Sequence, residues 1–282
     1  MSWWGKVLGG TFGFMLGGPL GAAIGAAIGH NFDRGLAGID RDNLEGASEE
    51  EQEKIQAAFF TATFSMMGYL AKSDGRVSEE EIGMARQVMA NMNLNADMRR
   101  AAINLFNQGK GAHFPARDMV EQFRKMCGRR TNLVRMFMEI QLQAVYADGE
   151  LHPAEEKALM QICQWLRFPV SSYRQLETMV RASIHAAGQQ RSDQGKRSQY
   201  RQQKKSSQSA EGMSIQDAYD LLGVTSTSSS AEIKRAYRRL MSQHHPDKLV
   251  SKGLPEEMIK LATEKTHQIR QAYEKIKALK GF

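Results

Sequence analysis

The sequence predicts an all-α protein with a single N-terminal transmembrane helix, a central helical bundle and a C-terminal helical hairpin. Three observations support this prediction. Residues 7–28 form an uncharged, glycine-rich stretch, residues from about 48 to 185 show helical periodicity with few breaks, and residues 214–282 carry two amphipathic stripes separated by a proline. The length of 282 residues favours two folded domains over one, at roughly 150 residues per domain.

The charge of the chain is unevenly distributed. The 38 Lys and Arg against 31 Asp and Glu give a net charge of +7, of which residues 1–185 contribute −1 and residues 186–213 and 214–282 contribute +4 each. This distribution argues against a protein-wide nucleic-acid surface, and no aromatic stacking platform accompanies the cations. The two cysteines, Cys127 and Cys163, are too few for a disulfide framework or a thiolate metal cage.

The N-terminal segment, residues 1–35, is a candidate membrane anchor. Val7 to Ile28 are 22 residues without a charge, and a helix of that length spans about 33 Å, enough for a bilayer core. We therefore expect a transmembrane helix at about residues 7–28. A soluble glycine-rich hairpin and a cleaved signal peptide are the alternatives. A signal peptide usually has an apolar core of about 7–15 residues behind a basic start, whereas only Lys6 precedes this stretch.

Glycine recurs at every fourth position of this span. The row predicted to form a dimer face comprises Gly9, Gly13, Gly17, Gly21 and Gly25. Small residues at this spacing let two membrane helices approach closely, so we expect a homodimer through the transmembrane helix. Charge leaves the orientation open, because basic residues flank both ends of the span.

The middle of the chain, residues 48–185, predicts a succession of helices. Ser48 and Glu51 predict a capping box at the start of the first helix. Two Asp-Gly pairs, at Asp74 and Asp148, each precede an acidic helix start, with Glu81 and Glu155 seven residues after the respective aspartate.

These four carboxylates are candidate ligands for a hard cation. Turn formation and the positive end of the following helix explain them without a ligand, so we expect no metal. The duplicated Asp-Gly loops followed by acidic helices resemble the TerB-like helical domain.

Residues 186–213 are polar and basic with little to bury, which predicts a flexible linker.

The C-terminal segment, residues 214–282, begins with strong helix signals. Ile215 to Leu222 can form two helical turns that end at Gly223, and Ser229 with Glu232 predicts a capping box for the next helix. One apolar stripe runs along that helix and comprises Ile233, Ala236, Tyr237, Leu240, Met241 and His244. Four cations share its outer face: Lys234, Arg235, Arg238 and Arg239.

A proline ends this helix. Pro246 lacks a donor and disfavours helical geometry at the preceding residue, so we expect an exposed loop that begins His245-Pro246-Asp247-Lys248. A second long helix is predicted to begin near Pro255 and to pack antiparallel on the first. The predicted hairpin then presents His-Pro-Asp at its tip with a basic face alongside.

Four sequence segments carry a resemblance to a known family: AYDLLGV at 218–224, AEIKRAYRRLM at 231–241, HHPDK at 244–248 and QIRQAYEKI at 268–276. Together they resemble the J domain of DnaJ-type co-chaperones. The resemblance implies that the protein binds the Hsp70 chaperone DnaK and accelerates its ATP hydrolysis, without being an enzyme itself and without a cofactor. It implies that His245, Pro246 and Asp247 are essential, that Lys234, Arg235, Arg238 and Arg239 form the docking face, and that Lys248 adjoins it.

The order of the parts adds to this resemblance. DnaJ itself carries a Gly/Phe-rich stretch and CxxCxGxG repeats, and neither occurs here. An apolar anchor, TerB-like helices, a basic linker and a C-terminal J domain together resemble membrane-anchored DnaJ-like proteins of Gram-negative bacteria. That likeness implies an inner-membrane anchor with a short periplasmic N-terminus and cytoplasmic C-terminal domains. The alternative function is a metal-responsive membrane scaffold with an accessory J domain.

Overall fold

The computed structural model of the chain describes residues 18–22, 46–73, 83, 86, 89, 94–128, 130–146, 151–197, 213–255 and 258–282. Within these ranges all regular secondary structure is helical, which confirms the predicted all-α class. The expected transmembrane helix at about 7–28 lies outside the described residues except for 18–22. Among the described helices, none combines the length and the apolar character that a bilayer span requires.

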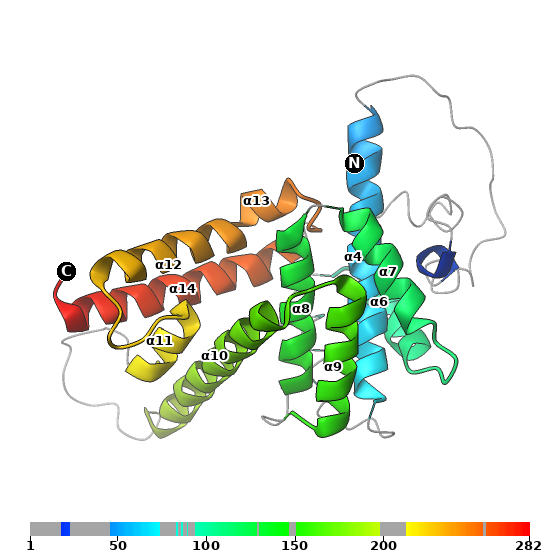
Figure 1. Cartoon of the computed structure of the whole chain (residues 1–282). Coiled ribbons are helices and arrows are strands. Elements are labelled where there is room, and N and C mark those ends of the chain that lie inside the picture. Colours follow the sequence, from blue (N-terminus) through cyan, green and yellow to red (C-terminus); the bar gives the residue numbers. More distant parts are fainter. Residues whose placement is uncertain are drawn as a thin grey trace. The chain divides into compact units, whose positions relative to one another are not determined.

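The helices that build the two parts described below follow one another along the chain (Figure 1). They are α4 (Gly46–Ala71), α6 (Ala96–Gly109), α7 (Ala116–Cys127), α8 (Thr131–Val145), α9 (Pro153–Leu166), α10 (Val170–Arg197), α11 (Ile215–Leu222), α12 (Ser230–His244), α13 (Pro246–Val250) and α14 (Ile259–Lys280).

These elements pack as two units. The first unit holds the chain up to Val170 together with Pro246–Leu261, and the second holds Ser171–His245 together with Ala262–Phe282. The helices expected to form the C-terminal hairpin are therefore mostly in the second unit. The segment that joins them belongs to the first.

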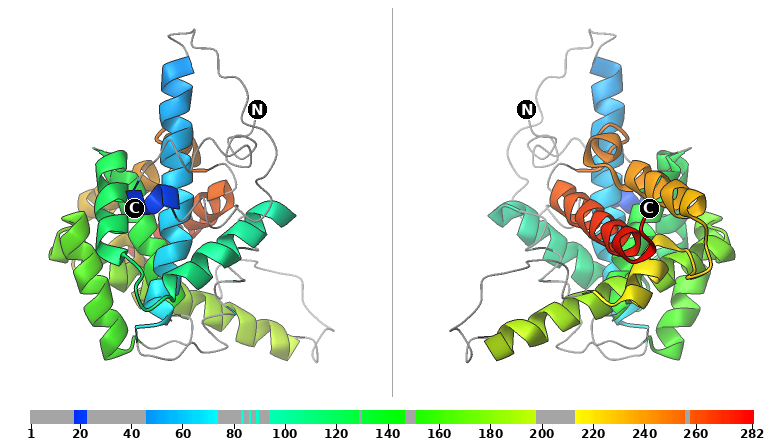
Figure 2. Two further views of the ribbon diagram at one scale, coloured as in Figure 1. Left: turned by 90° about the vertical axis from the view of Figure 1, so that its right-hand side faces the viewer. Right: turned by 90° about the vertical axis from the view of Figure 1, so that its left-hand side faces the viewer.

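Helix α4 forms the centre of the first unit. It contacts α6, α7, α8 and α9, and Figure 2 shows it as a long helix with other helices of the unit around it. All side chains from Ile55 to Gly68 are buried, including Phe59, Phe60 and Phe64. Burial of one such aromatic side chain stabilises a fold by roughly 1.5–3 kcal/mol. The helix begins at Gly46, so Ser48 lies inside it, and the capping box predicted at Ser48 is wrong.

Two glycines allow α4 and α6 to cross at very short distance. A Cβ on Gly68 would lie 2.0 Å from the carbonyl oxygen of Phe106, and one on Gly109 would lie 1.9 Å from the carbonyl oxygen of Ser65. No side chain fits at either position without moving a backbone. This helix pair therefore depends on glycine at both contact points.

In the second unit, the short helix α11 is fixed at both ends. The Ser214 hydroxyl accepts a hydrogen bond from the Asp217 amide at 3.0 Å, and the Asp217 carboxylate accepts one from the Ser214 amide at 3.2 Å. At the other end Gly223 has a φ of +64°, with bonds from the Val224 amide to the Tyr219 carbonyl and from the Gly223 amide to the Asp220 carbonyl. These two bonds make a Schellman motif, and Gly223 ends the helix as the sequence predicted.

The core of the second unit joins α10 to the hairpin helices. Its buried members are Met179, Ala182, Ala186, Met213, Ala218, Tyr219, Leu221, Leu222, Ile233, Leu240, Ile269, Ala272 and Ile276. The first three come from α10, which continues to Arg197 and includes residues 186–197 of the expected linker. Residues 198–212 lie outside the described part of the chain.

Candidate functional site

Helix α12 carries the four candidate cations and ends directly before the His-Pro-Asp tripeptide. Hydrogen bonds between neighbouring residues determine where this helix begins. The Ser229 amide donates to the Glu232 carboxylate at 2.7 Å, and the Glu232 amide donates to the Ser229 hydroxyl at 3.3 Å. The backbone hydrogen bond from Ser229 holds the pKa of the Glu232 carboxyl below its usual value. The predicted capping box is therefore formed, and it starts the helix at Ser230.

One side of α12 faces the core of the second unit. Ile233, Ala236, Leu240 and His244 are buried, while Tyr237 and Met241 are half-buried beside them. Tyr237 stacks on Tyr273 of α14 with ring centroids 4.2 Å apart. The predicted stripe thus packs against the second long helix, in agreement with the predicted hairpin.

The other side of α12 presents positive charge. Lys234, Arg235, Arg238 and Arg239 are all exposed. The Lys234 ammonium lies 5.1 Å from the centre of the Phe282 ring, and Arg238 Nε donates to the Lys234 carbonyl at 3.3 Å. Among the described residues, none of the four forms a salt bridge. This face is therefore able to attract an acidic surface over a distance comparable with the Debye length.

The His-Pro-Asp tripeptide begins directly at the end of α12. The helix ends at His244, and His245 is extended with φ −62° and ψ 124°, as expected for a residue that precedes proline. Pro246 then occupies the first position of α13, so the tripeptide lies at a junction between two helices. The prediction of an open loop here is wrong, because proline at a first helical position favours helix formation. The side chains of His245, Asp247 and Lys248 are exposed, and Pro246 is half-buried.

The candidate metal ligands fall mostly outside the described residues. Asp74, Glu81 and Asp148 are not described, whereas Glu155 is 3% exposed and accepts a hydrogen bond from the His152 amide at 3.0 Å. Glu155 therefore has the capping role that the turn chemistry suggested. No group of three or more metal-binding side chains occurs among the described residues.

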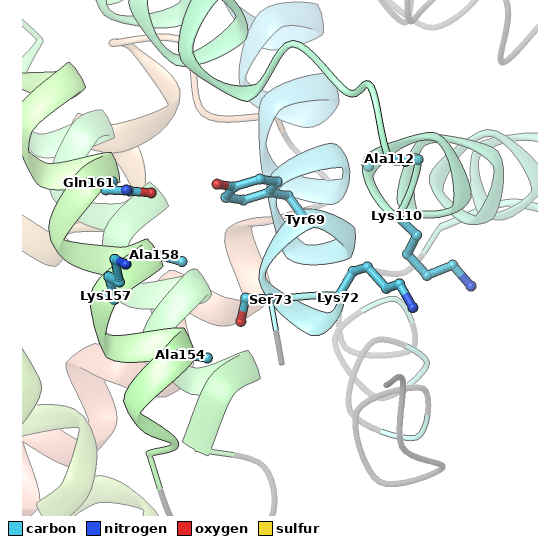
Figure 3. A pocket seen from close by; sticks show the side chains of 11 residues that line it. Tyr69, Lys72, Ser73, Lys110, Ala112, Ala154, Lys157, Ala158 and Gln161 are labelled. Carbon is cyan, nitrogen blue, oxygen red and sulfur yellow. The ribbon is translucent and has the colours of Figure 1, made fainter. Parts of the chain in front are cut away.

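A hollow of about 480 Å³ lies in the first unit beside the end of α4. Figure 3 shows Tyr69 directed from α4 toward α9, where Gln161 faces it, with Lys72 and Lys110 extending on the other side of α4. Lys157 of α9 also lines the hollow, and its described lining includes no carboxylate.

Sequence reasoning missed a buried charge on α14, the second helix of the hairpin. Lys265 of α14 lies on the apolar stripe between Ala262 and Ile269, is 4% exposed, and donates to the Ser183 hydroxyl of α10 at 3.1 Å. No local signal could reveal this contact, because its two residues are 82 positions apart in the chain.

The fold and the tripeptide define a J-domain protein, and the family models agree. A DnaJ domain matches residues 217–279, the tellurite resistance protein TerB matches residues 60–178, and the co-chaperone DjlA transmembrane domain matches residues 1–39. The chain is thus a membrane-anchored protein with a TerB domain and a J domain.

Full-length relatives specify the family. The co-chaperone protein DjlA of Escherichia coli K12 and that of Salmonella typhimurium LT2 are each 42% identical to the chain, and DjlA of Coxiella burnetii is 43% identical. Each alignment covers 100% of both chains. The chain belongs to the DjlA family of J-domain co-chaperones. No solved structure matches it.

Proposed function

We propose that this co-chaperone binds the Hsp70 chaperone DnaK through its J domain and stimulates DnaK to hydrolyse ATP. The observation that carries the proposal is the exposed His245-Pro246-Asp247 tripeptide at the end of a helix whose outer face holds four exposed cations. Both features belong to one stretch of the DnaJ-domain match, residues 217–279.

The roles of the tripeptide follow from its chemistry. Pro246 fixes φ at the start of α13, which reduces the conformational freedom that binding would otherwise remove. The exposed carboxylate of Asp247 accepts hydrogen bonds when ionised and pairs well with an arginine of a partner. The cations of α12 attract an acidic partner surface and orient the encounter.

Stimulation of ATP hydrolysis is then an allosteric effect on the partner. The J domain binds the hydrolysis-competent conformation of DnaK more tightly than its other conformations and so raises the population of that conformation. In this mechanism the co-chaperone supplies binding energy, and His245 acts as a contact residue and transfers no proton.

The test is the ATPase rate of DnaK with the full-length protein in detergent micelles. His245→Gln and Asp247→Asn should each abolish stimulation, because each removes a group that contacts the chaperone. The matched controls are His267→Gln on α14 and Asp118→Asn on α7, which change the same exposed side-chain types elsewhere. Melting temperatures equal to the parent's establish that the fold is intact. Full stimulation by either tripeptide variant contradicts the proposal.

We also propose that the anchor lies in the bacterial inner membrane, with a short periplasmic N-terminus and cytoplasmic TerB and J domains. The match to the DjlA transmembrane domain supports the anchor, and the need for an ATP-consuming partner supports the cytoplasmic side. Protease added to spheroplasts should leave residues 48–282 intact. Digestion of the J domain without membrane rupture would show the opposite orientation.

The glycine row supports a further part of the proposal, a homodimer through the membrane helix. Gly9, Gly13, Gly17 and Gly25 lie outside the described residues, and Gly21 lies in the short helical stretch 18–22. Replacing Gly13, Gly17 and Gly21 with leucine should lower the yield of crosslinked dimer in membranes, because bulky side chains separate the helices. Replacing Ala22, Ala23 and Ala26 in the same way is the control for added bulk. An undiminished yield would refute a glycine-mediated dimer.

We also propose the bounds 48–185 for the TerB domain, 186–213 for the connection and 214–282 for the J domain, with no metal or cofactor in any of these segments. Residues 186–197 of the connection continue helix α10. The capping role of Glu155 supports the absence of a metal. Calorimetric titration of the full-length protein with calcium, magnesium and zinc should show no saturable heat. A saturable signal that Asp74→Asn or Asp148→Asn removes would instead support the metal-responsive scaffold.

A further inference from the structure

The segment that begins at Pro246, within the tripeptide, packs with the TerB helices. Residues Pro246–Leu261 belong to the first unit, whereas the helices on either side, α12 and most of α14, belong to the second. Within this segment Leu249, Leu254 and Met258 have no exposed surface at all. Such complete burial in a short connection requires a partner surface beyond the connection itself.

Helix α13 is closed by its own hydrogen bonds. The Leu254 amide donates to the Leu249 carbonyl and the Gly253 amide to the Val250 carbonyl, each at 2.9 Å, which is a second Schellman motif. The Ser251 amide donates to the Asp247 carbonyl at 3.0 Å. The backbone of Asp247 is therefore connected through one compact turn to Gly253.

Gly253 in turn lies directly against helices α4 and α8 of the same unit. A Cβ at this position would lie 2.6 Å from Cγ2 of Ile55 on α4 and 3.7 Å from Cδ1 of Leu133 on α8. Gly253 also has a φ of +101°, which L-residues rarely adopt. One turn earlier, Gln52 Nε2 of α4 donates to the Val250 carbonyl at 3.2 Å. Both apolar and polar contacts thus hold the end of α13.

These contacts leave the tripeptide accessible. The side chains of His245, Asp247 and Lys248 are exposed, while Leu249, the next residue, is completely buried. The bound arrangement of α13 therefore does not cover the groups that the chaperone needs.

We propose that Gln52, Ile55 and Leu133 of the TerB domain form a socket that holds α13 and so positions Asp247 for DnaK. The inference rests on the proposed function and adds a role for the TerB domain in it. A held turn has little conformational freedom left to lose when the chaperone binds, so its affinity is higher than that of a mobile turn. The three residues are positioning residues, since they act through α13 and touch no part of the chaperone.

The first test titrates the full-length protein in micelles against DnaK and follows its ATPase rate. Ile55→Ala and Gln52→Ala should each raise the half-maximal concentration, by roughly threefold to tenfold for Ile55→Ala, with the maximal rate unchanged. The controls are Ile103→Ala, whose side chain is 43% exposed on α6, and Gln164→Ala on the exposed side of α9. An unchanged or lower half-maximal concentration for both socket variants would overturn the proposal. A lower value would show that the contact inhibits the J domain.

A second test needs no chaperone. Hydrogen exchange of the amides from Ser251 to Leu254 should be faster in Ile55→Ala and Gln52→Ala, while the exchange of α4 amides stays slow. Unchanged exchange at Ser251–Leu254 in both variants would refute the socket. Because Gln52 is only half-buried, its replacement leaves the α4 core intact even if Ile55→Ala destabilises it.

A compensation test isolates the contact itself. Gly253→Ala should release α13 because its Cβ meets Cγ2 of Ile55 and because a φ of +101° strains any L-residue, and adding Ile55→Ala should restore part of the slow exchange because it removes Cγ2. A double variant whose exchange at Ser251–Leu254 is as fast as that of Gly253→Ala would contradict the proposed contact. Failure of the parent to stimulate DnaK would refute the proposed function, whereas the exchange measurements would still decide whether the socket exists.

Discussion

Helices α4 and α12 differ in what surrounds them. Every side chain of α4 from Ile55 to Gly68 is buried, including Thr61, Thr63 and Ser65. Helix α12 buries one stripe and exposes four cations on the other side. An enclosed stretch of helix serves mainly packing, whereas a half-exposed helix can pack on one side and bind a partner on the other. Substitutions in the enclosed stretch of α4 should therefore lower stability, with Ile55 also acting on α13, whereas substitutions on the outer face of α12 should change binding alone.

The largest effect is expected at the crossing of α4 and α6. Gly68→Ala places a Cβ 2.0 Å from a backbone oxygen, so the helices must separate, and we expect a loss of stability above about 3 kcal/mol. Gly83→Ala is the matched control, since a Cβ on that helical glycine meets nothing within 4 Å and should stabilise the protein by about 0.5–1 kcal/mol. Urea denaturation measures both. Equal stability of the two variants would contradict the close crossing.

The second-largest loss of stability is expected in the buried stripe of α12. Leu240→Ala removes a side chain with no exposed surface, and the expected loss is about 2–5 kcal/mol. Leu279→Ala, whose side chain is 65% exposed on α14, should change stability by no more than about 0.5 kcal/mol. A loss below that of the Leu279 control would show that the stripe is not packed.

A smaller effect is expected at the start of α12. Ser229→Ala removes the cap and should lower stability by about 1 kcal/mol, whereas Ser229→Asn keeps a capping group.

The lowered pKa of the Glu232 carboxyl stabilises the folded state above the usual pKa of 4.5, and this contribution is lost as the pH falls through the lower folded value. The stability difference between the parent and Glu232→Gln should accordingly shrink below pH 4.5. A difference that grows on acidification would contradict the capping box.

The smallest effect on stability is expected on the outer face of α12. Arg238→Ala with Arg239→Ala should change stability by no more than about 0.5 kcal/mol, because both side chains are exposed. The same variant should raise the concentration needed to stimulate DnaK and reduce its dependence on salt. Arg270→Ala with Lys277→Ala on α14 is the control for lost charge. If the control weakens stimulation as much, the effect comes from net charge and α12 has no special role.

Features that depend on residues close together in the chain could be predicted from the sequence. The ends of α11 and α12 depend on residues within one turn, namely Ser214, Gly223 and Ser229, so their signals are visible locally. The outer cations and the tripeptide are likewise contiguous in the sequence. The fold class and the candidate site residues could therefore be proposed from the sequence.

Contacts between distant segments could not be predicted in this way. The approach of Gly68 to Phe106, the hydrogen bond from Lys265 to Ser183 and the contribution of α10 to the core each join residues far apart in the chain. The helical conformation of Pro246 was missed for a different reason. Proline ends one helix and favours the first position of another, and the sequence alone does not show whether a second helix follows.

The place of α10 in the second core has a practical consequence for anyone who wishes to express the J domain alone. A fragment cut at the boundaries of the family match, residues 217–279, would lose Met179, Ala182 and Ala186, and would leave the apolar patch beneath them open to water. Such a fragment would also leave the buried ammonium of Lys265 without its hydroxyl acceptor. Expression vectors that begin before Ser171 should yield soluble material, and shorter ones should aggregate.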